Sequence, residues 1–267
     1  MCGYIGETVL RTGRLPDFLL FTLAAWLVLI GGTACSRPTA NDDVHSVTIE
    51  TEDGHVIAVT AYTPREVQPP GILLVHRYGG NRGVWEHTAR VLQQEGVLSV
   101  VVDLRGHGES RQHHENTVHY RELPRDAWLE ALADVRAAKS VLLEMGADPD
   151  NLAVAGEGLG AGLALHYALE DPSMQAVIML SPGLETQGVK TERAITRLTD
   201  CPTLLMASDG DAYASMSANA LSDAAPVYSE LRMWPGAAHG VDIFDVQPEA
   251  IRFMTEWLSR IIGQKNS

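Results

Sequence analysis

The sequence predicts an α/β domain with a mostly parallel sheet of eight strands, helices on both faces and a minimal cap. Two observations lead to this prediction. Short apolar runs alternate with helical patterns from residue 45 onward, which is the order of elements in α/β proteins. The later runs, ILLV, LSVVVD, LAVAG, AVIMLS and TLLMAS, are almost continuously apolar, as expected for parallel strands that are buried on both faces.

The expected strands lie near residues 45–51, 55–63, 71–76, 97–103, 151–155, 174–180, 202–207 and 228–234. Polar and apolar residues alternate along the first two segments, which indicates β-strands. Asp53-Gly54 between these two segments is a hairpin signal. The domain is therefore expected to begin with an antiparallel hairpin and to continue as a parallel sheet.

The expected helices lie at about 81–95, 126–145, 159–170, 212–223 and 246–263. In the second of them, Leu132, Val135, Leu142 and Met145 are placed at helical spacing. Gly146 follows directly and is a natural residue for the end of a helix. Helices therefore alternate with the strands, as crossover connections in a parallel sheet require.

The composition fits one globular domain, residues 45–267, that follows a separate N-terminal segment. The formal net charge of the chain is −14, and residues 1–34 contribute nothing to it because their acidic and basic residues cancel. Such an excess of negative charge argues against nucleic acid or an anionic membrane surface as an electrostatic partner. Residues 183–200 are the only candidate for a lid, and this segment is short.

Residues 1–34 have the pattern of a signal peptide. Arg11 and Arg14 precede the apolar run FLLFTLAAWLVLIGG, which is shorter than the roughly 20 residues of a transmembrane helix. The ending GTAC resembles the lipobox of bacterial lipoproteins, although its glycine replaces the usual Leu-like residue. The resemblance implies a lipid on Cys35 that anchors an exported protein to a bacterial membrane, facing the periplasm or the cell surface, with residues 35–44 as a tether. An uncleaved anchor and ordinary secretory cleavage are the alternatives.

Cys201 is the single cysteine of the expected domain, because Cys2 would leave with the signal and Cys35 would carry the lipid. An exported chain with one internal cysteine has no internal disulfide framework. Cys201 opens the apolar run CPTLLMAS, so we expect a small buried residue.

A glycine-rich turn, GEGLG at residues 156–160, joins an expected strand to an expected helix. It resembles the nucleophile elbow of the α/β hydrolases, whose pattern is small–x–nucleophile–x–small. The central residue of an elbow has a strained backbone, so the residues two positions before and after it must be small. Centring the pattern on Gly158 satisfies this rule, whereas centring it on Glu157 would place Leu159 at a small position. The nucleophile position is therefore Gly158, and its nucleophile is lost.

A dinucleotide-binding loop is a weaker interpretation of the same glycines. That fingerprint belongs to the first strand–helix unit of its fold, and this turn comes late in the order of strands.

Further stretches resemble conserved loops of the α/β hydrolases along residues 45–263. VVDLRGHGES, residues 101–110, resembles the loop after the family's fourth strand. LLVHRYGGNR, residues 73–82, resembles the oxyanion loop, with Arg77 where a glycine is usual. The resemblance implies that the backbone N–H groups of Tyr78 and Leu159 form the oxyanion hole.

The same resemblance assigns an acid and a base. Asp211, within LLMASDGDAYA, aligns with the family's catalytic carboxylate, and His239, within RMWPGAAHGVDIF, aligns with the catalytic histidine. The chain order is then nucleophile, acid and base, as the fold requires. Each residue has an alternative role: Asp209 or Asp211 could cap the helix expected at 212–223, and His239 could be an ordinary residue of a surface loop.

Other polar residues are assigned to structural roles. His107 is expected to form hydrogen bonds within its own loop. His113, His114 and His119 lie in a polar segment without matching carboxylates, which favours a solvated loop over a metal site. Ser181 follows an expected strand but lies outside the elbow, so it is not assigned as a nucleophile. No metal and no cofactor are expected.

A glycine offers no atom to acylate, so covalent catalysis at this position is impossible. One hypothesis is a degenerate hydrolase, or pseudoenzyme, that binds a small ligand or a protein partner. A second is an active, esterase-like hydrolase of small acyl compounds in which His239 activates water. A third is that Gly158 is a change in an otherwise ordinary esterase. The short lid makes the chain most similar to dienelactone-hydrolase-like and serine-aminopeptidase-like members, and the oligomeric state is left open.

Overall fold

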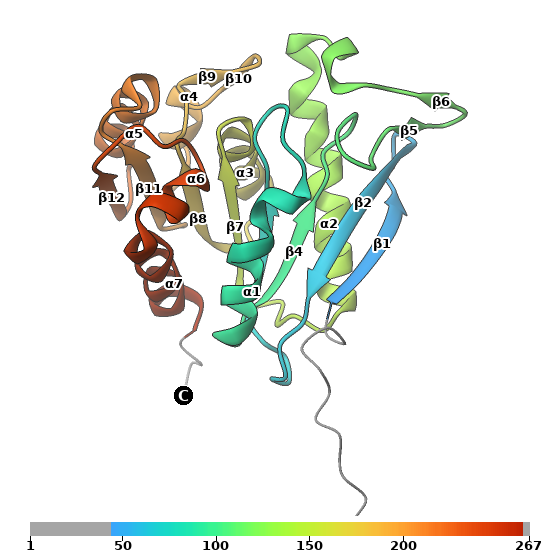
Figure 1. Ribbon diagram of the computed structural model, residues 1–267, viewed down its shortest axis with the longest axis horizontal. Coiled ribbons are helices and arrows are strands. Elements are labelled where there is room, and N and C mark those ends of the chain that lie inside the picture. Colours follow the sequence, from blue (N-terminus) through green and yellow to red (C-terminus); the bar gives the residue numbers. More distant parts are fainter. Residues whose placement is uncertain (1–43, 264–267) are drawn as a thin grey trace, which may run out of the picture. The chain divides into compact units, whose positions relative to one another are not determined.

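The computed structural model describes residues 44–263, so the predicted signal peptide, Cys35 and the predicted tether up to residue 43 lie outside the described residues (Figure 1). The central sheet has the strand order β12-β11-β8-β7-β3-β4-β2-β5-β6, and β1 pairs with the outer side of β2. Every pairing from β4 through β3, β7, β8 and β11 to β12 is parallel, whereas β1, β2, β5 and β6 pair antiparallel. The prediction of a mostly parallel sheet with a leading hairpin is confirmed.

All eight predicted strands are present. The strands of the main sheet are β1 (Val44–Glu50), β2 (His55–Tyr62), β3 (Gly71–Val75), β4 (Leu98–Val102), β7 (Leu152–Glu157), β8 (Met174–Leu180), β11 (Thr203–Ser208) and β12 (Ser229–Trp234). The sheet nevertheless has ten strands, because the two-residue strands β5 (Gln112–His113) and β6 (Asn116–Thr117) extend it beside β2. Strands this short have too little periodicity to be recognised in a sequence.

The described residues form seven α-helices: five lie at the predicted places, and two short ones, at residues 192–195 and 242–246, were not predicted. They are α1 (Glu86–Gln94), α2 (Leu132–Glu144), α3 (Leu159–Glu170), α4 (Glu192–Ile195), α5 (Ala212–Ala224), α6 (Asp242–Val246) and α7 (Pro248–Ile262). The 3-10 helices are η1 (Arg82–Trp85), η2 (Tyr120–Glu122) and η3 (Arg125–Ala131). Two expected helices, 81–95 and 126–145, therefore each begin as a 3-10 segment, which is common at helix N-termini.

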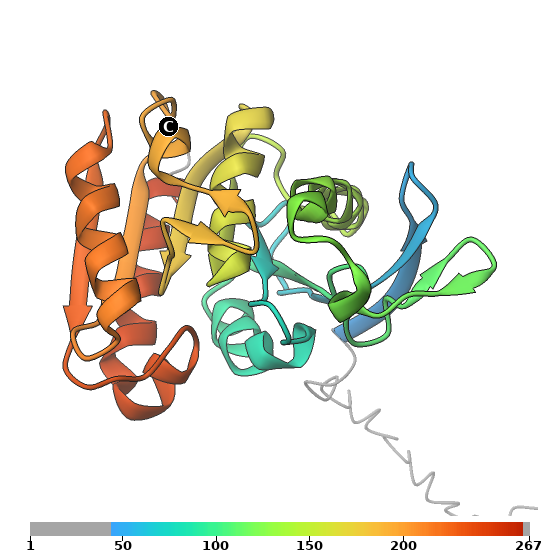
Figure 2. The same ribbon diagram turned by 90° about the horizontal axis from the view of Figure 1, so that it is seen from above.

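Two hydrophobic clusters cover the two faces of the sheet. One cluster joins the sheet to α2, α3 and α5, through residues such as Val135, Leu163 and Ala218. The other joins it to α1 and α7, through residues such as Leu92 and Trp257. Figure 2 shows α3 and α1 on opposite sides of the sheet. None of the helices between residues 44 and 263 is both long enough and apolar enough to cross a bilayer.

The loops that matter for function follow the carboxyl ends of the parallel strands, and these ends meet at one edge of the sheet. The segment 183–200, which was expected to be a small lid, forms the hairpin of β9 (Glu185–Thr186) and β10 (Val189–Lys190), followed by α4. Val189 of this hairpin packs beside Gly162 of α3. The residues between β6 and η3, which include η2, form a second excursion from the sheet that the sequence did not predict.

Candidate active site

The glycine-rich turn forms the predicted elbow. Strand β7 ends at Glu157, helix α3 begins at Leu159, and Gly158 between them has φ 53° and ψ −113°. A Cβ at Gly156 would lie 2.1 Å from the carbonyl oxygen of Gly160, and a Cβ at Gly160 would lie 2.2 Å from the carbonyl oxygen of Val75. Both flanking positions therefore require glycine, which is the steric rule that placed the centre of the elbow at Gly158.

Gly158 faces the imidazole of His239. A Cβ at Gly158 would lie 3.4 Å from Nε2 of His239 and 3.2 Å from Cβ of Arg77. The backbone N–H of Gly158 donates to the carbonyl of Leu180 on the neighbouring strand, at 3.0 Å, which fixes the turn against the sheet. A side chain at this position would therefore point at the histidine nitrogen that a general base uses.

His239 and Asp211 form a close pair. The Nδ1 of His239 lies 2.6 Å from Oδ2 of Asp211, and the imidazole side chain is 43% exposed. A carboxylate in contact with Nδ1 favours the tautomer that leaves Nε2 free to accept a proton. Asp211 also caps the N-terminus of α5, where its Oδ1 accepts from the N–H of Ala214 at 3.4 Å. The capping role and the pairing with His239 are therefore both realised, by different oxygens of one carboxylate.

Asp209, the neighbouring candidate, has a different role. Its Oδ1 accepts from the backbone N–H of Gly236 at 3.0 Å, so it fastens its own turn to the loop after β12.

The oxyanion loop follows β3 and is held by two buried histidines. His107 accepts the N–H of Gly79 on Nε2 at 3.0 Å, and its Nδ1 lies 3.1 Å from the carbonyl of Arg105. His76 accepts the N–H of Leu104 on Nε2 at 3.0 Å, and its Nδ1 lies 2.7 Å from the carbonyl of Arg77. Burial lowers the pKa of His76 to about 4 and that of His107 to about 3, so both imidazoles are neutral at pH 7.

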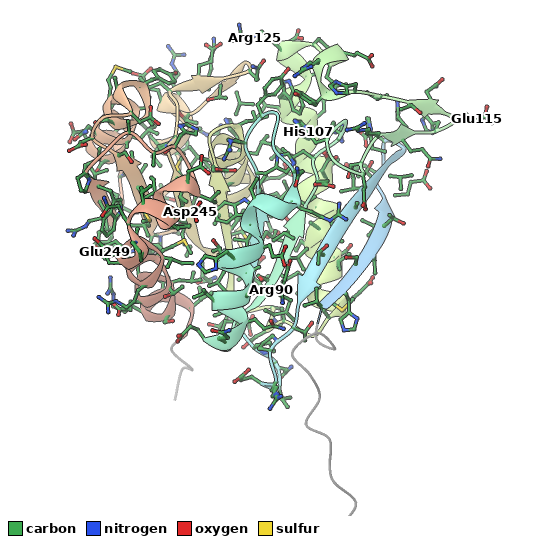
Figure 3. All side chains as sticks on the ribbon, viewed as in Figure 1. Arg90, His107, Glu115, Arg125, Asp245 and Glu249 are labelled. Atoms are coloured by element: carbon green, nitrogen blue, oxygen red, sulfur yellow. The ribbon has the colours of Figure 1, made fainter. Side chains whose placement is uncertain are left out.

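The expected structural role of His107 is thus confirmed, and its bond to Gly79 also ties its loop to the oxyanion loop. Figure 3 shows His107 among the side chains near the loop end of the sheet, whereas Glu115 and Arg125 lie at the periphery.

The backbone N–H groups of Tyr78 and Leu159 make no hydrogen bond to any acceptor in residues 44–263. Leu159 is the first residue of α3, where an N–H has no partner within the helix. These are the two groups that the sequence assigned to the oxyanion hole, and both remain free to donate to a ligand oxygen.

Arg77 of the oxyanion loop contacts Glu157, the residue before Gly158, and the sequence did not reveal this contact. Nη1 of Arg77 lies 2.9 Å from Oε2 of Glu157, and the Glu157 side chain is fully buried. The same Oε2 accepts from the backbone N–H of Val241 at 3.0 Å. Nη2 of Arg77 lies 3.7 Å from Oδ2 of Asp242. A buried carboxylate requires partners of this kind, and no local pattern could have indicated residues 80 or more positions away.

Ser181 contacts the loop that carries His239. This buried residue has φ 44°, and its Oγ accepts from the backbone N–H of Gly240 at 2.8 Å. The position of Ser181 after β8, outside the elbow, agrees with the expectation that it is not the nucleophile.

His113 and Cys201, which the sequence analysis also considered, lie in contacts within the fold. His113 stacks on His55 with 4.1 Å between the ring centroids, and its Nε2 lies 3.1 Å from the carbonyl of Asp53. Within the part of the chain that the structure describes, no three His, Cys, Asp or Glu side chains are grouped to hold a metal ion. Cys201 is buried as expected, and burial raises the pKa of its thiol to about 12.

Comparison with known proteins gives a sequence match to hydrolases. The model of the serine aminopeptidase family S33 matches residues 70–200, which include the oxyanion loop and the elbow and end before Asp211. The pimeloyl-[acyl-carrier protein] methyl ester esterase of Pseudoalteromonas atlantica is 35% identical over 104 residues, or 39% of this chain. The match spans only 33% of the length of that curated relative.

Solved structures match over most of the chain. Alpha/beta hydrolase GrgF from Penicillium sp. has a TM-score of 0.70 at 13% identity, with 83% of this chain and 99% of that chain covered. Dienelactone hydrolase from Anabaena variabilis has a TM-score of 0.64 at 19% identity, with 82% and 99% covered. A carboxyl esterase from Bacillus coagulans has a TM-score of 0.67 at 12% identity, with 82% and 99% covered. The chain therefore has the α/β-hydrolase fold, and the matches together support the α/β-hydrolase superfamily.

Proposed function

We propose that this hydrolase-like protein has lost covalent catalysis and uses the former active site to bind a small ligand or a protein partner. The observation that carries the proposal is the position of Gly158: it occupies the elbow, faces Nε2 of His239 and has no side-chain atom to acylate. Removing the serine of a comparable hydrolase costs about 10⁶-fold in turnover. A site with the other parts in place would still bind compounds that the nucleophile once attacked.

The relatives suggest a chemical class for the ligand. The matched sequence relative is named as a methyl ester esterase, and one structural neighbour is named as a carboxyl esterase. The free N–H groups of Tyr78 and Leu159 would donate hydrogen bonds to a carbonyl oxygen of the ligand. We therefore propose small acyl compounds as the first ligands to examine.

A second function is favoured by the Asp211–His239 pair, whose 2.6 Å contact remains although the nucleophile is missing. A water molecule in the place of the missing hydroxyl could give its proton to His239 and attack a bound ester directly. General-base catalysis of this kind typically contributes 10²–10⁴-fold, so such an enzyme would be slow.

The two functions are separated by measurements on the full-length chain in detergent. We expect no covalent labelling at the site by a serine-directed phosphonate and little or no turnover of short-chain aryl esters. The control is the His239→Ala variant. Robust ester hydrolysis by the native protein that disappears in this variant would establish the water-dependent hydrolase and reject the binding protein.

We further propose that Cys35 carries a lipid and anchors the domain to a bacterial membrane. The support is the ending GTAC after an apolar run of signal-peptide length. Mass spectrometry of the mature protein should find a lipid-modified N-terminal Cys35, and a Cys35→Ala variant should lack that modification. A mature N-terminus without lipid would reject the anchor.

A further inference from the structure

Glu157 joins three segments that are distant in the chain. Its carboxylate accepts hydrogen bonds from the guanidinium of Arg77 at 2.9 Å and from the backbone N–H of Arg77 at 3.4 Å, so it contacts the oxyanion loop twice. It also accepts a hydrogen bond at 3.0 Å from the backbone N–H of Val241, which lies two residues after His239. Glu157 itself is the residue before Gly158. One buried carboxylate therefore connects the elbow, the oxyanion loop and the loop that carries His239.

Ser181 provides a second attachment of the His239 loop. Its Oγ accepts the N–H of Gly240 at 2.8 Å. The N–H groups of Gly240 and Val241 are consecutive, and both donate to buried side chains at the ends of the adjacent strands β7 and β8. Asp211 orients the imidazole ring, whereas these two contacts hold the backbone from which the ring extends.

The fit around the carboxylate is tight. Gly240 has φ 60°, and a Cβ at this position would lie 1.9 Å from Oε2 of Glu157. Any larger residue at position 240 would displace the carboxylate or the loop. Arg77 supplies the positive charge that a fully buried carboxylate requires, because an unpaired buried charge costs several kcal/mol. Arg77, which replaces the usual glycine of the oxyanion loop, and Glu157 are therefore parts of one arrangement.

We propose that Glu157 and Ser181 are positioning residues that hold His239 at the elbow through the backbone of Gly240 and Val241, with Arg77 as the counter-charge of Glu157. The proposal rests on the proposed role of His239 as the base of the site. It predicts that both residues act on the His239–Asp211 contact without touching either side chain. A misplacement of about 1 Å at a reacting group can cost roughly 10²-fold in rate.

The first test is independent of any activity. The proton between Nδ1 of His239 and Asp211 should give a downfield ¹H NMR signal in the full-length protein in detergent, identified by its loss in His239→Ala. Glu157→Gln and Ser181→Ala should each shift this signal upfield or abolish it. Both substitutions are close in size to the native residue, and circular dichroism would confirm that each variant is folded.

The second test uses the variant Gly158→Ser. If it hydrolyses aryl esters, adding Glu157→Gln or Ser181→Ala should lower kcat about 10- to 100-fold, with KM changed less than threefold. If it hydrolyses none, the proposal that the site derives from a hydrolase fails. The NMR signal of the first test then still shows whether Glu157 and Ser181 position His239.

The matched control is Asp171→Asn. Asp171 is a largely buried carboxylate that accepts from Lys139 at 2.5 Å, and it lies at the far end of α3 from Gly158. Its substitution should lower the melting temperature and leave the His239 signal unchanged. The proposal is overturned if Glu157→Gln and Ser181→Ala behave like this control, with lower stability but an unchanged His239 signal. Loss of the signal in all three variants would equally overturn it, since the effect would then be general.

Discussion

Replacing Gly158 by serine should restore an esterase and destabilise the fold by a small amount. The backbone at φ 53° and ψ −113° is one that non-glycine residues rarely adopt, and holding such a residue there costs about 1–3 kcal/mol. Replacing glycine also lowers the conformational entropy of the unfolded chain, which stabilises the folded protein by about 0.4–1 kcal/mol. The net cost is between about 0 and 2.6 kcal/mol, which for a domain of this size lowers the melting temperature by at most about 10 °C.

The expected gain in activity follows from the position of the new side chain. Its Cβ would lie 3.4 Å from Nε2 of His239, so rotation about χ1 can bring Oγ to the usual hydrogen-bond distance of about 2.7–2.8 Å. Arg77, whose Cβ would be 3.2 Å away, has to move by a few tenths of an ångström. A complete triad would raise turnover by up to about 10⁶-fold over the native protein.

The assays are aryl-ester hydrolysis and phosphonate labelling followed by mass spectrometry. Gly158→Ala is the matched control, because it has the same backbone strain and the same Cβ contacts but no hydroxyl. It should lose as much stability as the serine variant and gain no activity. The reasoning is refuted if the serine variant is folded, shows the expected loss of stability and is neither labelled nor active. Labelling of Ser181 in the native protein would also contradict the assignment of the elbow.

Three further predictions concern the acid, the buried histidines and a buried ion pair. Asp211→Asn should lower kcat of the serine variant about 10⁴-fold, because the histidine then takes the wrong tautomer, and ester hydrolysis measures this loss. The folded-state pKa values of His76 and His107, about 4 and about 3, lie below the unfolded value of about 6.5, so the unfolded state binds more protons as the pH falls. The free energy of unfolding should therefore decrease between pH 6.5 and 4 by up to about 1.4 kcal/mol per pH unit for each histidine, and His107→Gln should reduce this slope in urea titrations. Arg105→Met should cost about 3–5 kcal/mol by urea denaturation, because it leaves the fully buried Asp134, whose oxygen lies 2.7 Å from the guanidinium, without its main partner. A loss of unfolding free energy near zero in Arg105→Met would contradict this reasoning.

The order of elements and the centre of the elbow could be predicted from the sequence because both depend on local rules. Continuous apolar runs indicate strands that are buried on both faces, and the eight main strands lie where such runs or alternations occur. The elbow has a steric requirement for small residues at fixed offsets, so Gly156 and Gly160 identify Gly158 without any tertiary information. The short strands β5 and β6 and the short helices α4 and α6 have too few residues for a periodic signal.

The resemblance of the sequence to the α/β hydrolases also identified Asp211 and His239 as candidates for the acid and the base, since their motifs occur in the order that this fold requires. Only the tertiary structure decided that Asp211 both caps α5 and contacts His239. It also decided that Arg77 and Glu157 form an ion pair, and that the buried carboxylate of Glu157 also contacts the His239 loop. The physical reason is that burial and charge pairing depend on residues brought together from distant parts of the chain. A local pattern can place a glycine at the centre of a turn, but it cannot show what lies opposite that glycine.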